Sequence, residues 1–334
     1  MKNKRQNFTT SVKEALRMHL GILIALLAIC VLLTFATDTF LTTKNIFNVL
    51  RQIAVNTFLA CGMTMVIILG GIDLSVGSVI ALSACVASIV MTKMGLSCVV
   101  ALIAALVVGA LVGAINGLIA SRTTIPPFII TLATMNITRG IARVVVDNKA
   151  VSVDNDMYKF IGTGYVLGIP VHVLFIVAVV LIVYVLLNRT KFGRGIYAVG
   201  GNRMAAEYSG VNPRKVTFFV FLLNGILAGC AGVLSGSRTM VGQYSLGDGA
   251  EMDAITAVVL GGTSMSGGVG TIGGTVIGCL IVGCLKNGMN LLGIDSSWQY
   301  VVQGVVVLIA VYIDFIKKSV FFEKIKKQTK KVNR

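Results

Sequence analysis

The chain has 334 residues, of which 56% are hydrophobic and only 13% charged, and its formal net charge is +16. Because soluble domains carry roughly 25% charged residues, this composition excludes an ordinary soluble fold and indicates an all-α, polytopic membrane protein. We expect no nucleic-acid partner, because such a partner needs basic residues gathered on one surface with a recognisable motif, and here they are scattered.

Ten apolar stretches follow one another along the chain. A membrane-spanning helix needs about 20 apolar residues, and helices are expected because the hydrocarbon core cannot satisfy free backbone groups. The stretches cover residues 19–36, 50–69, 75–91, 97–120, 127–146, 166–187, 216–235, 252–260, 269–292 and 298–315. The eighth is too short to cross alone, so we expect it to continue through Gly261–Gly268 or to form a re-entrant half-helix. The first lacks a small-residue cleavage site and is not expected to be a signal peptide.

Basic residues set the expected orientation, since Lys and Arg accumulate in short cytoplasmic loops. Most of the chain's 29 basic residues fall in the tail 1–18, the loop 188–215 and the tail 316–334. We therefore predict that these three segments and both termini are cytoplasmic, with six crossings before the loop and four after it. Residues 147–165 carry more Asp than Lys and are expected on the outer face.

A glycine break occurs twice. Residues 69–77 read LGGIDLSVG and residues 260–268 read LGGTSMSGG, and five of the nine positions are identical. Each copy ends one apolar stretch and opens another, which predicts two related halves with a substrate path at their interface. In the first copy, Asp73 or Ser75 could cap the next helix or contact a hydroxylated substrate, and the sequence leaves both interpretations open. Ser264 replaces Asp73 in the second copy, so the turn itself does not require a carboxylate.

Uncharged polar side chains inside the apolar stretches form a second candidate set. Neutral donors and acceptors suit the hydroxyl groups of a sugar, although hydrogen bonds between helices explain the same residues. Together with the first break, the candidates for a translocation path are Gln52, Asn56, Asp73, Ser75, Thr131, Thr134, Asn224, Asn287, Asn290 and Gln299. We expect Lys286 to reach the membrane interface and Arg139 and Arg143 to lie near an outer helix end.

Catalytic patterns are missing from the sequence. It contains no P-loop motif, only two histidines, and seven cysteines without CxxC spacing that we expect to be buried free thiols. We therefore predict no enzymatic activity, no metal and no cofactor. The apolar stretches also lack the isolated charges that mark proton-driven carriers, so active transport would need energy from another polypeptide.

The middle loop contains signals for one short helix. Asn202 can cap it, Gly210 can end it, and Pro213 prevents its continuation. Such a helix is placed to dock on a cytoplasmic partner, and the alternative is a plain connecting loop.

Five segments carry a family resemblance. They are residues 62–78 (GMTMVIILGGIDLSVGS), 127–140 (PFIITLATMNITRG), 194–212 (RGIYAVGGNRMAAEYSGVN), 252–278 (MDAITAVVLGGTSMSGGVGTIGGTVIG) and 286–299 (KNGMNLLGIDSSWQ). From about Phe40 to Asp314 the chain resembles the membrane permease subunits of bacterial ABC importers for ribose and related monosaccharides. One departure is Ala133, where many relatives have Gly, and it should alter packing only slightly.

The resemblance implies a single permease domain over residues 1–334 in the bacterial inner membrane, in contact with lipid. It also implies a second copy of the chain, a cytoplasmic ABC ATPase and an extracytoplasmic sugar-binding protein. The loop helix matches the family's coupling helix, which gives the ATPase-coupling candidates Gly201, Asn202, Ala205, Ala206, Ser209 and Gly210.

The function expected on these grounds is ATP-driven monosaccharide import by alternating access. Ribose is the best single guess, with galactose, xylose, allose or a furanose signal molecule left open. A stand-alone secondary sugar carrier and a non-transporting scaffold or sensor subunit remain as alternatives from other classes.

Overall fold

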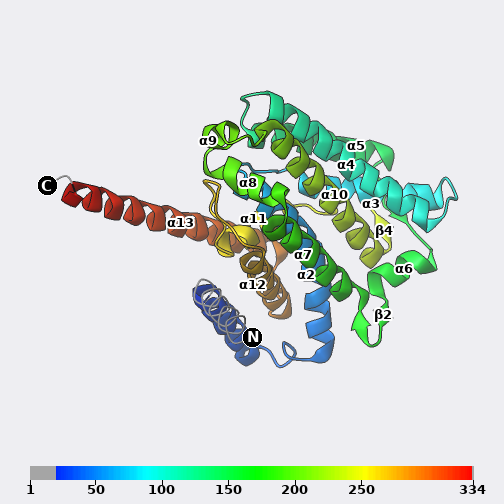
Figure 1. The fold of residues 1–334 in the computed structure, drawn as a ribbon. Coiled ribbons are helices and arrows are strands. Elements are labelled where there is room, and N and C mark those ends of the chain that lie inside the picture. Colours follow the sequence, from blue (N-terminus) through cyan, green and yellow to red (C-terminus); the bar gives the residue numbers. More distant parts are fainter. Residues whose placement is uncertain (1–19, 333–334) are drawn as a thin grey trace, which may run out of the picture.

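The computed structural model describes the backbone of residues 20–332 and the side chains of residues 20–312, 315 and 316. The predicted tail 1–18 lies outside the described residues. In chain order the helices are Leu20–Ala36, α2 (Thr43–Ile68), α3 (Val76–Thr92), α4 (Cys98–Arg122), α5 (Pro127–Val145), α6 (Asp156–Thr163), α7 (Val171–Arg189), α8 (Lys191–Gly201), α9 (Arg203–Tyr208), α10 (Pro213–Thr239), α11 (Ala250–Leu260), α12 (Ile272–Leu291) and α13 (Ser296–Val332). Figure 1 shows that they form a helical body from which α13 projects.

A helix occupies each of the ten predicted apolar stretches. Six of these helices are long and apolar enough to cross a membrane by themselves: α2, α4, α5, α7, α10 and α12. Shorter apolar helices cover Leu20–Ala36, Val76–Thr92 and Ser296–Tyr312. The predicted polytopic helical architecture is confirmed at this level, whereas the number of crossings and the orientation stay predictions.

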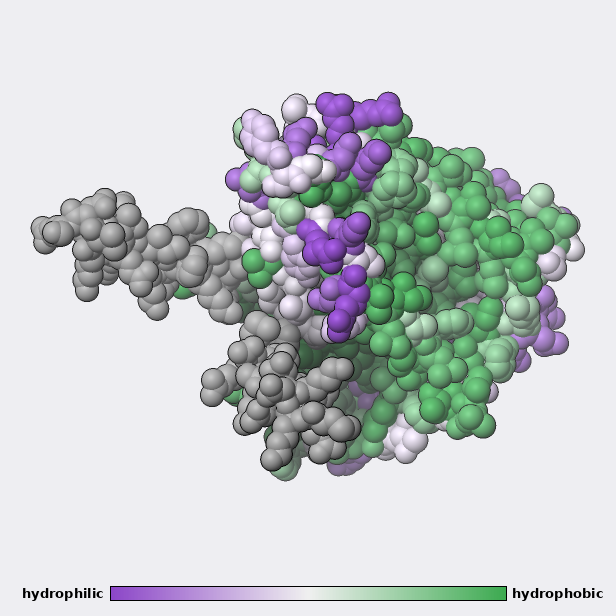
Figure 2. Space-filling model, viewed as in Figure 1, coloured by the Kyte–Doolittle hydropathy of each residue, from purple (hydrophilic) through white to green (hydrophobic). Residues whose placement is uncertain are grey.

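The core is centred on α2 and α10. The second half of α2, from Thr57 to Ile68, is buried throughout, and the helix packs against α7, α10, α11 and α12. By contrast, α4 exposes Ile103, Val107, Leu111 and Ile115 in a stripe with a spacing of four residues. Figure 2 shows such hydrophobic residues covering much of the visible flank, as expected for a surface in contact with lipid.

Glycines bring α4 and α10 into direct backbone contact. A Cβ atom at Gly109 would overlap the carbonyl oxygen of Gly225, and one at Gly225 would overlap the carbonyl oxygen of Gly109. Gly113 and Gly117 extend the same stripe of α4 along α10. Small residues repeated every four positions permit this close approach in membranes, which explains part of the high glycine content.

Two ends of the body can be distinguished (Figure 1). One end carries α8 and α9. The opposite end carries α6, the hairpin of β2 (Tyr165–Val166) and β3 (Ile169–Pro170), and the antiparallel pair of β1 (Val151–Ser152) with β4 (Val241–Gly242). Residues 147–165, which are predicted to lie outside, therefore lie at the end away from the basic middle loop.

The eighth apolar stretch forms α11, which does not continue as a helix through Gly261–Gly268; of the two alternatives this leaves a half-helix, whose re-entrant course stays a prediction. The helix ends at Leu260 because the following glycines turn the chain. A non-helical segment instead precedes α11: Gly242 lies against Ser88 of α3, and Gly247 lies against Gly77 at the start of the same helix. Residues 242–249 thus run back along α3 from one end of the body into its interior, where α11 begins.

Candidate functional site

Both glycine breaks end a helix with the same hydrogen-bond pattern. At the first, the amides of Gly70 and Gly71 donate to the carbonyls of Ile67 and Val66 at 2.9 Å each. At the second, Gly262 donates to Val259 at 2.9 Å, and the next amide donates one residue further back. Gly70 and Gly262 carry the positive φ that this C-terminal motif requires. The positive φ belongs to the first glycine of the first LGG sequence and to the second glycine of the second. This shift of one position arises because α2 ends at Ile68, before its LGG sequence, whereas α11 ends at Leu260, the first residue of its own.

Asp73 lies at the centre of a buried polar cluster. Its Oδ1 accepts hydrogen bonds from the Ser75 amide at 2.9 Å and the Ser75 hydroxyl at 2.6 Å. Its Oδ2 accepts one from Nδ2 of Asn224 at 2.8 Å. Of the two interpretations that the sequence left open, a side-chain cap by Ser75 is not observed: α3 begins at Val76 without one, because the Ser75 hydroxyl donates to Asp73 and accepts from Asn116.

The cluster joins four helices to the first break. Asn116 of α4 donates to the Ser75 hydroxyl at 2.9 Å, and Thr131 of α5 accepts from the Leu74 amide at 3.1 Å. Asp73 is only 1% exposed, so in this conformation it contacts protein groups and is closed to a substrate. Sequence analysis missed Asn116, although a single Asn within an apolar run was an available signal.

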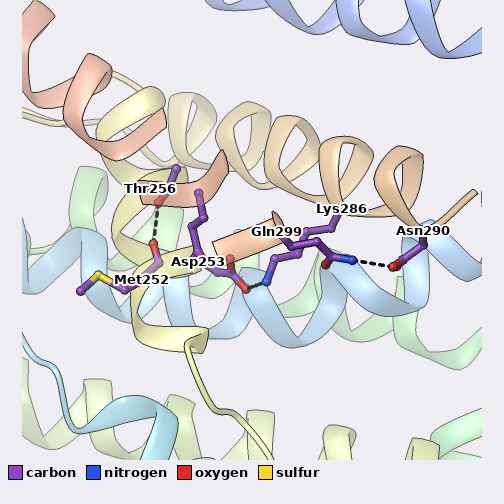
Figure 3. A network of polar contacts seen from close by, with 7 residues as sticks. Met252, Asp253, Thr256, Lys286, Asn290 and Gln299 are labelled. Atoms are coloured by element: carbon purple, nitrogen blue, oxygen red, sulfur yellow. Dashed lines mark hydrogen bonds and ion pairs between the residues drawn. The ribbon is translucent and has the colours of Figure 1, made fainter. Parts of the chain in front are cut away.

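A second polar network joins α11, α12 and α13 (Figure 3). Lys286 of α12 forms an ion pair with Asp253 of α11, and Gln303 of α13 donates to the other Asp253 oxygen at 2.6 Å. Gln299 donates to Asn290 at 2.7 Å beside this pair. The ammonium group of Lys286 is held by a carboxylate that is 13% exposed, and its expected place at the membrane interface stays a prediction.

Asn287 takes part in a third contact. It exchanges two hydrogen bonds with Asn45 of α2, at 2.9 and 2.8 Å, and both side chains are buried. Asn45 precedes the apolar stretch that was predicted for this part of the chain, so sequence reasoning did not consider it.

The remaining candidates make no side-chain to side-chain hydrogen bond with these three groups among the described residues, although Thr134 donates to the backbone carbonyl of Thr131 at 3.1 Å. Thr134 bonds to the Ile130 carbonyl of its own helix at 3.2 Å. Gln52 and Asn56 are half-buried on α2, and the Asn56 side-chain oxygen is enclosed with no hydrogen-bond partner among the described residues. The predicted set therefore divides into separate groups and does not line one preformed cavity.

Arg139 holds the non-helical segment before α11. Its Nη1 donates to the carbonyls of Tyr244 at 2.6 Å and Leu246 at 2.8 Å, and the neighbouring Arg143 guanidinium lies 4.9 Å from the centre of the Tyr244 ring. Non-helical backbone within a membrane protein needs such internal partners, since lipid supplies none. Arg139 thus has a structural role that its predicted place near a helix end did not suggest.

The middle loop folds into two helices, α8 and α9. Asn202 caps α9 by accepting from the Ala205 amide at 3.0 Å, Gly210 has a φ of 81°, and Pro213 is the first residue of α10. The predicted short helix is therefore confirmed. Met204 and Tyr208 are 65% and 86% exposed, so α9 presents large side chains at its end of the body.

Helix α8 was not predicted, because Gly193, Gly195, Gly200 and Gly201 weaken its helical signal. Tyr197 in the middle of α8 donates its hydroxyl to the Gly270 carbonyl, two residues after the second break, at 2.9 Å. Burial raises the pKa of Tyr197, which keeps this hydroxyl protonated and able to donate.

Six helices long and apolar enough to cross a membrane, together with two broken helix connections and an exposed short helix, agree with the membrane transport subunit that the sequence predicts. The chain belongs to the family described as "Branched-chain amino acid transport system / permease component", whose model matches residues 45–311. It is thus an ABC transporter permease and a multi-pass protein of the bacterial inner membrane.

Several curated proteins are similar to the chain over most of their length. It is 46% identical to the ribose import permease protein of Bacillus subtilis over 92% of this chain and 95% of that protein. Identity to the ribose import permease protein of Escherichia coli is 43%, over 87% of this chain and 92% of that protein. Identity to the D-allose transport system permease protein of Escherichia coli is 40%, over 84% of this chain and 86% of that protein. No solved structure matches the chain.

Proposed function

We propose that the protein is the membrane subunit of an ATP-driven importer for a monosaccharide, with ribose as the substrate. The observation that carries the proposal is the 46% identity to a ribose import permease protein across nearly the full length of both chains. Matches to permease proteins for allose and xylose are weaker, at 40% and 34%. They support a monosaccharide as the substrate class even if the particular sugar differs.

In this proposal two copies of the chain enclose the sugar path, and ten crossings place both termini in the cytoplasm. A cytoplasmic ABC ATPase binds α9 through Met204 and Tyr208, which are the large exposed hydrophobic side chains of that helix. An extracytoplasmic sugar-binding protein docks at the opposite end, where α6 and the β2–β3 hairpin lie. The polar content of the core suits this substrate, because sugar hydroxyls need neutral hydrogen-bond partners.

The buried clusters would take part by changing partners during transport. In the conformation described, Ser75 and Asn224 donate to the Asp73 carboxylate, and Thr131 accepts from the Leu74 amide, so sugar contact there would require the first break to open. Gln52 and Asn56 are half-buried, and neither side chain has a hydrogen-bond partner among the described residues. They are therefore the better candidates for contact with sugar in the conformation described.

The test is uptake into proteoliposomes that contain this chain with an ABC ATPase and a sugar-binding protein from the same organism. We expect uptake of radiolabelled ribose. This uptake should require the ATPase, the binding protein, and ATP on the side of the membrane where the ATPase is bound. Equal uptake without the ATPase would identify a secondary carrier, and uptake by cells that lack this chain would identify a scaffold or sensor. Preference for another sugar would revise only the substrate.

A further inference from the structure

Three segments that are distant in sequence meet at one point beside the last turn of α8. They are the last turn of α8, the last turn of α2 and the second glycine break. The amide of Gly268 donates to the carbonyl of Ile68 at 2.8 Å, and a Cβ atom at Gly200 would overlap that same carbonyl oxygen. We call this contact of Ile68, Gly200 and Gly268 the glycine junction.

No side chain separates the backbones at the glycine junction. Gly267 and Gly268 have φ angles of 81° and 74°, which L side chains rarely adopt. A Cβ atom at Gly267 would lie 2.7 Å from the Gly200 carbonyl oxygen, and one at Gly268 would lie 2.9 Å from Cα of Gly201. Because the contact is made by backbone alone, a shift of one segment displaces the other two directly.

Tyr197 provides a second link between α8 and the second break. Its ring lies one turn before Gly200, and its hydroxyl donates to the Gly270 carbonyl, two residues after Gly268. The second break is therefore held to α8 by both a backbone contact and a side-chain hydrogen bond.

The junction also leads directly to α9 and to the first break. Asn202 is at once the residue that follows α8 and the N-cap of α9, so no loop separates the two helices. In the other direction, Ile68 is the last residue of α2, and the first break with its buried Asp73 cluster follows it. A displacement of α9 thus has a short, mostly helical route to both breaks.

We propose that Gly200 and Tyr197 are positioning residues that transmit movement of α9 to both glycine breaks, so that sugar movement follows ATP hydrolysis. This inference rests on the proposed function, since it assumes that an ATPase moves α9. It adds that the two breaks move together, because one contact of α8 holds both of them.

The experiment uses the full complex in proteoliposomes and measures ribose imported per ATP hydrolysed. Loss of one hydrogen bond typically changes an equilibrium about 2- to 10-fold. We therefore expect Tyr197→Phe to lower this ratio by about that factor, while ATP hydrolysis continues. Gly200→Ala should lower it further. Gly195→Ala is the matched control on the same helix, because its Cβ would meet only side-chain methyl groups, at 3.3 and 3.6 Å, and it should keep the wild-type ratio.

The outcomes for the variants and for the wild-type complex distinguish failure of the inference from failure of the proposed function. Wild-type ratios in Tyr197→Phe and in assembled Gly200→Ala would overturn the inference, as would an equal fall in Gly195→Ala. If Gly200→Ala fails to assemble with the ATPase, Tyr197→Phe decides alone, since it removes one hydroxyl and keeps the ring. A wild-type complex that hydrolyses ATP without importing ribose or another monosaccharide would overturn the proposed function, and the inference with it. A wild-type complex that imports sugar, with unchanged ratios in both variants, would overturn only the inference.

Discussion

The side chains of Asp73 and Asn224 share a 2.8 Å hydrogen bond, although 151 positions of sequence separate them. Both are almost fully buried, so Asn224→Ala would leave one carboxylate oxygen without this donor in the protein interior. We expect a loss of about 1–3 kcal/mol in the free energy of unfolding, the usual cost of an unsatisfied buried group. Thermal unfolding of the purified chain in detergent measures it.

A matched control for this prediction is Asn136→Ala. Asn136 is exposed on α5 and bonds only to the Leu132 carbonyl of its own helix, at 3.2 Å. It should therefore change stability by less than about 0.5 kcal/mol, as surface substitutions usually do. An equal loss of unfolding free energy in both variants would mean that the hydrogen bond between Asn224 and Asp73 does not stabilise the fold.

The sequence predicted that Asp73, Ser75, Thr131 and Asn224 were notable, but it did not predict that they meet. Each stands out locally because it is polar within an apolar region. Their contact depends on how α3, α4, α5 and α10 pack, which no local pattern encodes. The same holds for Lys286: its position on a helix was clear, but its partner Asp253 lies 33 positions earlier on another helix.

Removing the Lys286 charge should destabilise the packing of α11 on α12. Lys286→Met leaves the Asp253 carboxylate largely buried with Gln303 as its remaining partner. Because an uncompensated buried charge is costly, we expect a loss of about 3 kcal/mol or more, seen as a lower melting temperature in detergent.

The double variant Asp253→Asn with Lys286→Met tests the cause. It removes both charges, so it should recover most of the stability that Lys286→Met loses. Losses that simply add would show that the two residues do not interact in the folded protein.

Substitution of Arg139 should loosen the non-helical segment 242–249. Arg139→Gln removes the donors that serve the Tyr244 and Leu246 carbonyls, and the interior offers these groups no water in exchange. We expect faster proteolysis or hydrogen exchange in this segment and reduced transport. Arg143→Gln, which removes only the contact with the Tyr244 ring, should have a smaller effect, and the reverse order would contradict this assignment.

Helix signals were reliable where they were local and failed where tertiary contacts override them. Asn202, Gly210 and Pro213 bound α9 from the sequence alone, because a cap, a positive φ and a proline act within a few residues. Helix α8 contains four glycines and was not predicted. Its Gly200 is placed where only a glycine fits against Ile68, so the residue that weakens the helix locally also allows its packing.

The predicted orientation can be tested with reporter fusions at exposed turns. A fusion after Gly210 should report cytoplasm, because it lies in the basic loop 188–215. One after Lys149, at the opposite end of the body, should report the outer side. A fusion after Val332 should match the Gly210 result if ten crossings are correct. A mismatch between these two would mean that an odd number of crossings follows the loop.

The exposed face of α9 gives the most direct test of ATPase docking. Ala206 is 4% exposed, whereas Met204 is 65% exposed, so a charge at Ala206 would disturb folding and one at Met204 would alter only the surface. Met204→Asp should therefore insert and melt like the wild-type chain but recover less ATPase in co-purification, by about tenfold if it removes 1.4 kcal/mol of binding. Ala206→Glu should instead lower the yield of folded chain. Normal ATPase recovery and normal transport with Met204→Asp would mean that the ATPase does not bind through this face of α9.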